Sequence, residues 1–200
     1  PCTMDPGMIA KSMRSGDFSE LPEFMESIAR GAFELVTKTG DGQLLEVYLD
    51  RKMFETMYDE IKSYKSDFLE KWIELNCDAV NCSIILRGSK AEIDERIAGE
   101  ALIPIGKIQK NEAKTAILEG VSAAESFLER IYPDAVKSWK KSTSEFEKWK
   151  DNLLSDYLKA SKYKAFGIEP VLAFLKGKET EIQAVRMIIN GIKNNIPKSN

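Results

Sequence analysis

The stretch 67-DFLEKWIELNCDAVNCSIILRG-88 predicts a long helix that is apolar over a broad side. Its apolar residues recur at intervals of three and four, the spacing that places side chains on one side of an α-helix. They form a stripe of Phe68, Leu69, Trp72, Ile73, Cys77, Val80, Ile84 and Ile85. Asp67 is expected to cap the N-terminus of this helix, and Gly88 is expected to end it.

Helical patterns separated by short polar breaks also fill the chain before this stretch. Leu21-Pro22 opens an apolar-periodic segment that stops at a turn cluster, TGDG at residues 39–42. In the segment that follows, Asp50 is expected to cap a helix that begins near Arg51. No part of the chain shows the alternation of a strand, so we predict an all-α protein.

The second half of the chain shows the same organisation. Ser89 is expected to cap a short helix around Ile93 and Ile97, and LIPIG at 102–106 predicts a buried turn or linker. We expect two helical units, 1–100, incomplete at its N-terminal edge, and 101–200, with their boundary near the Leu102–Gly106 loop.

Composition excludes several classes of protein. The chain has 200 residues with 29 Lys and Arg against 32 Asp and Glu, a balance that argues against a nucleic-acid protein. No apolar run approaches the roughly 20 residues that a membrane-spanning helix needs. Histidine is absent, which removes the commonest general base and the commonest metal ligand. The three cysteines, Cys2, Cys77 and Cys82, show no disulfide-scaffold spacing and fit a reducing cytoplasm.

Three motifs suggest chemistry but match it poorly. Gly106-Lys107 and Gly177-Lys178 lack the Ser or Thr that follows the lysine of a phosphate-binding loop. Cys77 and Cys82 have no second ligand pair for zinc and are expected to be small buried hydrophobes. Carboxylates that could pair as acid and base are usually solvated charges on helices. They are Glu74, Asp78, Asp94, Glu95, Glu179 and Glu181. We predict no catalytic, cofactor-binding or metal-binding residue.

Two features leave a structural and a functional alternative open. Arg87 and Arg186 adjoin apolar helix positions, so each is either an internal brace between helices or a contact on a partner protein. A second feature is an apolar seam with gaps of three and four, favoured as core with an inter-subunit surface as the alternative. It comprises Ile182, Val185, Ile189, Ile192 and Ile196.

The stretch 166-FGIEPVLAFLKGKETEIQAVRMIINGIKNNIP-197 resembles the C-terminal signature of the d-type connector subunit of V-type and archaeal A-type rotary ATPases. The family begins a helix at a proline and continues with a Lys-Glu pair, a Glu-Ile pair, an arginine and an Ile pair. The matching residues are Pro170, Lys178-Glu179, Glu181-Ile182, Arg186 and Ile188-Ile189.

Three further places match the family in the right order. They are Leu21-Pro22 with Leu49-Asp50-Arg51 and Phe54, then Asp78 with Asn81 and Arg87, then Leu102-Ile103-Pro104 with Gly106. The chain departs from the family at Gln183-Ala184, where an Arg-Asn-like pair is usual, and at Ile105, where Gly is common. The beginning of the family pattern is missing, so we expect a fragment that lacks the N-terminal part.

The resemblance implies repeated helical-bundle units in a funnel-like array and a rotor part without catalytic residues or cofactors. It implies a place between the central-stalk subunits and the membrane proteolipid ring, where ATP hydrolysis or synthesis is coupled to proton or other ion transport. The implied location is cytoplasmic and peripheral to the membrane through the complex, with no direct membrane insertion and no nucleic-acid partner.

Structural or interface roles are expected for nine residues of these matching segments. They are Asp50, Arg51, Asp78, Asn81, Arg87, Lys178, Glu179, Glu181 and Arg186. The alternatives are a stand-alone helical adaptor or regulatory protein, and an enzyme that uses its Glu and Asp residues.

Overall fold

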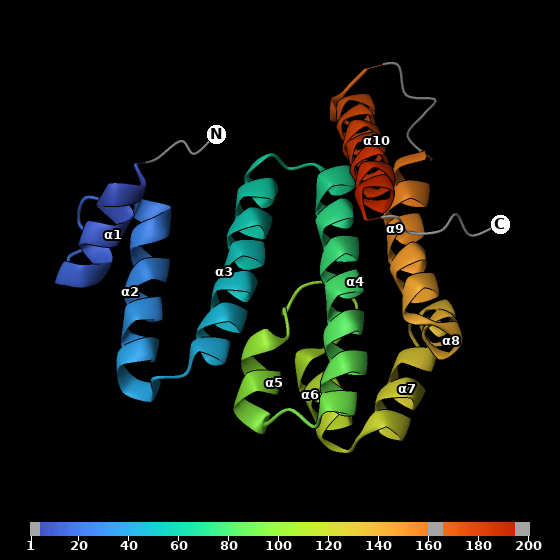
Figure 1. Ribbon diagram of the computed structural model, residues 1–200, viewed down its shortest axis with the longest axis horizontal. Coiled ribbons are helices and arrows are strands. Elements are labelled where there is room, and N and C mark those ends of the chain that lie inside the picture. Colours follow the sequence, from blue (N-terminus) through green and yellow to red (C-terminus); the bar gives the residue numbers. More distant parts are fainter. Residues whose placement is uncertain (1–4, 160–165, 195–200) are drawn as a thin grey trace. The chain divides into compact units, whose positions relative to one another are not determined.

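A computed structural model describes residues 5–159 and 166–194. These residues form helices joined by short turns, with no strand among them, so the all-α prediction is confirmed (Figure 1). The helices are α1 (Pro6–Ser15), α2 (Glu23–Thr39), α3 (Gly42–Ser63), α4 (Asp67–Ala91), α5 (Glu95–Ala101), α6 (Lys110–Leu118), α7 (Val121–Glu129), α8 (Pro133–Lys141), α9 (Thr143–Lys159) and α10 (Ile168–Lys193).

The chain divides into two compact units, Pro1–Phe146 and Glu147–Asn200. In the first unit α2 packs on α3, α3 packs on α4 and α5, and α4 also contacts α6 and α7. Figure 1 shows α3 and α4 as long neighbouring helices with the short helices α5 and α6 near one end of them. The expected division into units 1–100 and 101–200 concerns repeated bundles and stays a prediction, as does their funnel-like arrangement.

Helix α4 is the centre of the first unit, as its broad apolar stripe predicts. Ile73, Cys77 and Ile85 are fully buried, and Ile73 and Cys77 form a core cluster with residues of the loop after α5. The predicted cap is wrong by one residue, because the Ser66 hydroxyl accepts the hydrogen bond from the Leu69 N–H and Asp67 is the first helical residue.

Gly88 does not end α4, which continues to Ala91. A Cβ at Gly88 would lie 2.8 Å from the Cδ1 atom of Ile93, so the glycine leaves room for this side chain instead of stopping the helix. The αL conformation that closes α4 is adopted by Glu92, with φ 51°.

Two further caps differ from the predictions. Asp50 lies inside α3, because that helix already begins at Gly42 and Asp41 accepts its capping hydrogen bond from the Leu44 N–H at 3.0 Å. Ser89 lies inside α4, and α5 is capped by Asp94.

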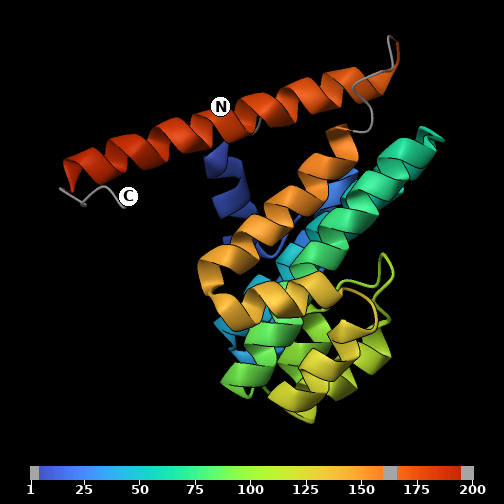
Figure 2. The ribbon, with the colours of Figure 1, turned by 90° about the vertical axis from the view of Figure 1, so that its right-hand side faces the viewer.

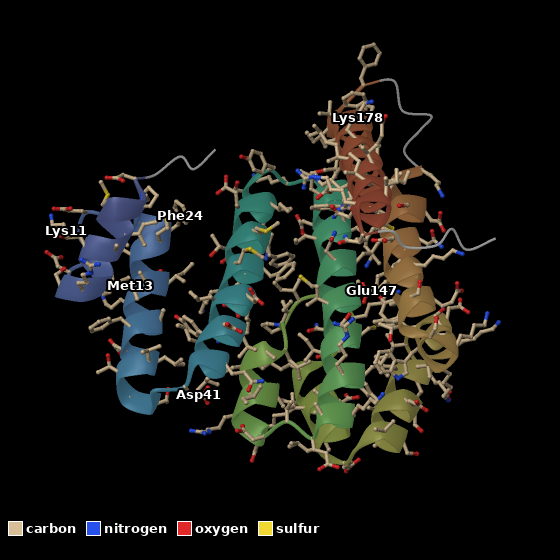
Figure 3. All side chains as sticks on the ribbon, in the orientation of Figure 1. Lys11, Met13, Phe24, Asp41, Glu147 and Lys178 are labelled. Atoms are coloured by element: carbon tan, nitrogen blue, oxygen red, sulfur yellow. The ribbon has the colours of Figure 1, made fainter. Side chains whose placement is uncertain are left out.

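The turn predicted at 39–42 is confirmed. Gly40 ends α2 in the left-handed region with φ 65°, and Figure 3 shows Asp41 between α2 and α3. A periodicity therefore locates a helix more reliably than an isolated Asp or Ser locates its first residue, because such residues also occur inside helices.

Candidate functional site

A buried carboxylate on α4 joins three parts of the first unit. Asp78 is fully buried, and its Oδ1 and Oδ2 accept hydrogen bonds from the Lys107 N–H, both at 3.0 Å. Oδ1 also accepts from the Ile108 N–H at 3.2 Å, and Oδ2 accepts from the Tyr132 hydroxyl at 2.6 Å. The carboxylate thus connects α4 to the loop before α6 and to the residue before α8.

One helical turn further along α4, Asn81 holds the other end of the same loop. Its Nδ2 donates to the Ile103 carbonyl and its Oδ1 accepts from the Ile103 N–H, both at 2.9 Å. Asn81 is fully buried, so the amide replaces both hydrogen bonds that the Ile103 backbone would make in a regular element. Asp78, Asn81 and Tyr132 are called the polar anchor below.

The 102–108 loop needs a glycine where it crosses Asp78. Gly106 has φ 101°, a conformation that side chains rarely adopt, and a Cβ there would collide with the Asp78 carboxylate. Leu102, Ile103 and Ile105 are buried beside it, which confirms the predicted buried turn. Lys107 comes directly after this glycine. Its backbone N–H, and not its side-chain ammonium group, donates the hydrogen bond to Asp78.

The anchor raises the pKa of its neighbours. Burial, and then the hydrogen bond to Asp78, raise the pKa of Tyr132 far above its ordinary value, so the hydroxyl remains a donor. Burial, followed by the charges of Asp78 and Glu74, raises the pKa of the Cys77 thiol to about 12. Cys77 and Cys82 are both fully buried, which confirms their prediction as small buried hydrophobes, whereas Cys2 lies outside the described residues.

Stability is expected to depend on Cys77 at alkaline pH. The folded state keeps the thiol proton up to about pH 12, whereas an unfolded cysteine loses it near about pH 8.5. The contribution is therefore complete below about pH 8.5 and is lost as pH rises toward 12. In urea titrations between about pH 7.5 and 10.5, the difference in unfolding free energy between wild type and Cys77→Ala should shrink with pH. A constant difference would show that the thiol is not protected.

A second polar contact braces α3 against the end of α5. Arg51 donates through Nε to the Glu100 carbonyl at 3.0 Å and through Nη2 to the Glu100 carboxylate at 2.5 Å. Its Nη1 donates to Glu55 at 2.7 Å, and the guanidinium lies 5.7 Å from the Tyr48 ring centroid. Burial opposes the charge, but the bonds to Glu100 and Glu55 raise the pKa of Arg51. Arg51 thus braces α3 internally against the end of α5.

Replacing Arg51 by Ala should lower the unfolding free energy of the first unit by about 2 kcal/mol, because the Glu100 carbonyl and two carboxylates lose a half-buried partner. Lys38→Ala, which removes an exposed i,i+4 pair with Glu34, is the matched control and should change little. The measurement is chemical denaturation followed by far-UV circular dichroism. Equal effects of the two variants would exclude a bracing role for Arg51.

The second unit presents a different surface. No residue of α10 is buried, so the favoured assignment of its apolar seam to the core is wrong for the described residues. Ile182, Val185 and Ile189 are 52%, 50% and 44% exposed, and Ile196 lies outside the described residues. Figure 2 shows α10 as one straight helix, about 39 Å long at 1.5 Å per residue.

Met187 is exposed on the opposite side of α10, but most of the exposed apolar residues of this helix share one side, because their main spacings are three, four and seven residues. This α10 apolar face comprises Val171, Phe174, Leu175, Ile182, Val185, Ile189 and Ile192. A cleft lined by both helices shows that α10 turns other residues toward α9. From α10 these are Pro170, Ala173, Lys176, Gly177 and Thr180. The helix therefore meets α9 through its smaller and more polar side.

The charged residues predicted on α10 are exposed. Lys178 pairs with Glu181 at 2.7 Å and Lys176 pairs with Glu179 at 2.8 Å, each within the helix. Arg186 is exposed between Ile182 and Ile189, and Arg87 is exposed on α4. Gly177 and Lys178 lie in mid-helix, where no loop can surround a phosphate, so the phosphate-loop interpretation fails on geometry as well as on sequence.

The structure brings only some of the predicted residues together. Asp78 and Asn81 hold one loop, whereas Arg51 acts at α5 and Asp50 is exposed on α3. Sequence reasoning missed Tyr132 and Glu100, whose role depends on contacts across 54 and 49 residues. Their signal was weak, since a Tyr before a Pro and a Glu near a helix end are common.

The described residues contain no group of three or more His, Cys, Asp or Glu side chains arranged to hold a metal ion. Among the helices at 5–159 and 166–194, none is long and apolar enough to cross a membrane.

Comparison with known proteins gives one match. The family described as ATP synthase (C/AC39) subunit matches residues 1–200, the entire length of this sequence. No curated protein and no solved structure matches the chain. This match agrees with the resemblance to the rotary-ATPase connector, which rests on the motifs of the 166–197 stretch and on the three matching places earlier in the chain. The chain belongs to the ATP synthase C/AC39 subunit family.

Proposed function

We propose that this chain is the non-catalytic connector of a V-type or A-type rotary ATPase. It links the central-stalk subunits to the membrane proteolipid ring, so that ATP hydrolysis or synthesis is coupled to ion transport. Family membership supports the proposal that the chain is part of a rotary ATPase complex. The α10 apolar face is the observation that supports a connecting role. A helix about 39 Å long that exposes an apolar side is typical of a protein interface.

The first unit supplies the stiffness that such a part needs. A connector transmits torque only if its helices do not slide under load, and the polar anchor and Arg51 each fix a loop or helix end to a long helix. Hydrogen bonds in a buried, low-dielectric environment are directional and costly to break. The residues of these contacts are therefore assigned to rigidity and not to acid–base chemistry.

In this proposal the chain lies on the cytoplasmic side and meets the membrane only through the ring. It needs no cofactor, because the chemistry belongs to other subunits. Lys178 and Glu181 form an ion pair along α10. Such charged side chains keep the chain soluble before its apolar face is covered by assembly.

Purification of the complex through a tag on a stalk subunit tests this function. The chain should be recovered with the stalk and the proteolipid ring, and its deletion should abolish ATP-driven ion pumping while ATP hydrolysis by the detached catalytic sector continues. If the deletion strain still pumps ions at the wild-type rate, the connector role is excluded. Recovery of the chain alone, with the composition of the complex unchanged by deletion, would favour the stand-alone adaptor.

A further inference from the structure

A groove on the first unit runs between α6 and α7, with a volume of about 480 Å³. Each helix contributes a row with gaps of four and three residues, so each row follows one side of its helix. The α6 row is Glu112, Ala116 and Glu119, and the α7 row is Ala123, Phe127 and Arg130. Ala116 and Phe127 are buried and form an apolar floor, while the charged residues are exposed at its edges.

The α6 edge of the groove carries two carboxylates that are not engaged in an ion pair in the described part of the chain. Glu112 and Glu119 form no ion pair within the described residues, and each is exposed. The nearby acidic residues of α7 differ, because Lys140 pairs with Glu125 at 3.0 Å and with Glu129 at 3.1 Å. Two carboxylates without an ion pair to any described residue therefore line one edge of the groove, opposite Arg130.

The spacing of the two carboxylates fits a helix as the occupant. Glu112 lies on α6 and Glu119 is its C-cap residue, seven positions later, which corresponds to two helical turns or about 10.5 Å. A second helix lying along the groove repeats the same spacing at positions i and i+7. The small side chains Ala116 and Ala123 let its backbone approach closely. Phe127, which is 4% exposed and lies under the Arg130 guanidinium, completes the apolar floor.

We propose that the groove between α6 and α7 docks a helix of a partner subunit in the rotary complex that carries Lys or Arg at positions i and i+7 with an apolar residue between them. The two cations meet Glu112 and Glu119, and the apolar residue rests on Ala116 and Phe127. At the opposite edge Arg130, 5.5 Å from the Phe127 ring centroid, offers a site for a carboxylate of the same helix.

This inference rests on the proposed connector function and names the chemistry of one partner. The carboxylates of the α6 edge repel nucleic-acid phosphates and anionic lipid headgroups, so these ligands do not fit the groove. The groove belongs to the first unit, whereas the α10 apolar face belongs to the second, so each surface has its own variants.

The partner is identified by a photo-crosslinking residue placed at Ser126, an exposed residue that lines the groove, in the assembled complex. Ser144, an exposed serine on α9 outside the groove, is the matched control position. Mass spectrometry of the Ser126 product should identify a helical peptide with two basic residues seven apart. A peptide without them, a lipid or nucleic-acid adduct, or a yield equal to that at Ser144 would overturn the proposal.

Charge reversal then tests the ion pairs. Glu112→Lys with Glu119→Lys should reduce the crosslink at least about tenfold, the effect of 1.4 kcal/mol, and exchange of the two partner cations for Glu should restore it. The control, Glu46→Lys with Asp59→Lys, makes the same charge change at exposed positions of α3.

The two proposals fail in distinguishable ways. If the wild-type chain does not purify with the complex, the connector function is wrong. If it does purify with the complex and the Glu112 and Glu119 variant crosslinks as wild type, only the groove proposal is wrong.

Discussion

Asp78→Ala is expected to lower the unfolding free energy of the first unit by about 4 kcal/mol, enough to unfold a marginal domain. The variant removes the Asp78 acceptor from two backbone N–H groups and from the Tyr132 hydroxyl, all of them at buried or partly buried hydrogen bonds. Each unsatisfied donor costs about 1–3 kcal/mol, and the cavity left by the carboxylate adds to this sum. The cost is large because all three donors depend on one residue.

Two further variants separate the carboxylate's contacts. Asp78→Asn keeps the volume and one acceptor oxygen, so its cost should be about half that of Asp78→Ala. Tyr132→Phe removes one hydrogen bond and should cost about 1 kcal/mol.

Hydrogen exchange locates the effect of these variants. The amides of Lys107 and Ile108 should lose protection in Asp78→Ala before the amides in the middle of α3 do. Unchanged protection of these two amides, or equal unfolding free energies for all three variants and wild type, would show that Asp78 does not hold the loop.

The sequence predicts the helices well but not the contacts that fix them. Periodicity in 67–88 identifies α4, because burial of apolar side chains dominates the placement of a helix. Of the predicted stripe only Ile73, Cys77 and Ile85 are buried, because α4 is packed on several sides and also buries residues outside the stripe. The caps predicted at Asp50, Asp67 and Ser89 are wrong, because one hydrogen bond from a short side chain decides which residue caps a helix.

The polar anchor could be predicted only in part. Asp78, Asn81 and Gly106 were identified through their resemblance to a family pattern, and all three meet at the 102–108 loop. Tyr132 was missed, because no local rule connects a residue before Pro133 with a carboxylate 54 positions earlier. The seam of α10 was identified correctly as apolar, but periodicity does not tell a core helix from one that exposes the same side.

Val185→Asp combined with Ile189→Asp is expected to release the chain from the rotary complex. Both residues lie at the centre of the α10 apolar face, and a buried carboxylate at each position would be left without a partner. Loss of two apolar anchors costs about 2 kcal/mol each, so the affinity of the chain for the stalk and ring should fall about a thousandfold. Its recovery with them should then be lost.

The same substitutions should leave the isolated chain folded, because both side chains are about half exposed in it. Gln183→Asp with Asn190→Asp is the matched control: it places the same two charges on α10 at exposed positions away from the apolar face, and it should keep assembly intact. Binding is measured by co-purification and stability by urea denaturation of the isolated chain.

The comparison of binding with stability decides what covers the α10 apolar face. A variant that loses assembly and keeps its unfolding free energy places the partner outside the chain, which is the expected result. A variant that loses unfolding free energy in the isolated chain by the same amount would show that the face is buried against other residues of this polypeptide. Assembly at the wild-type level would show that the α10 apolar face is not part of the interface, because two charges buried in an apolar interface must weaken binding.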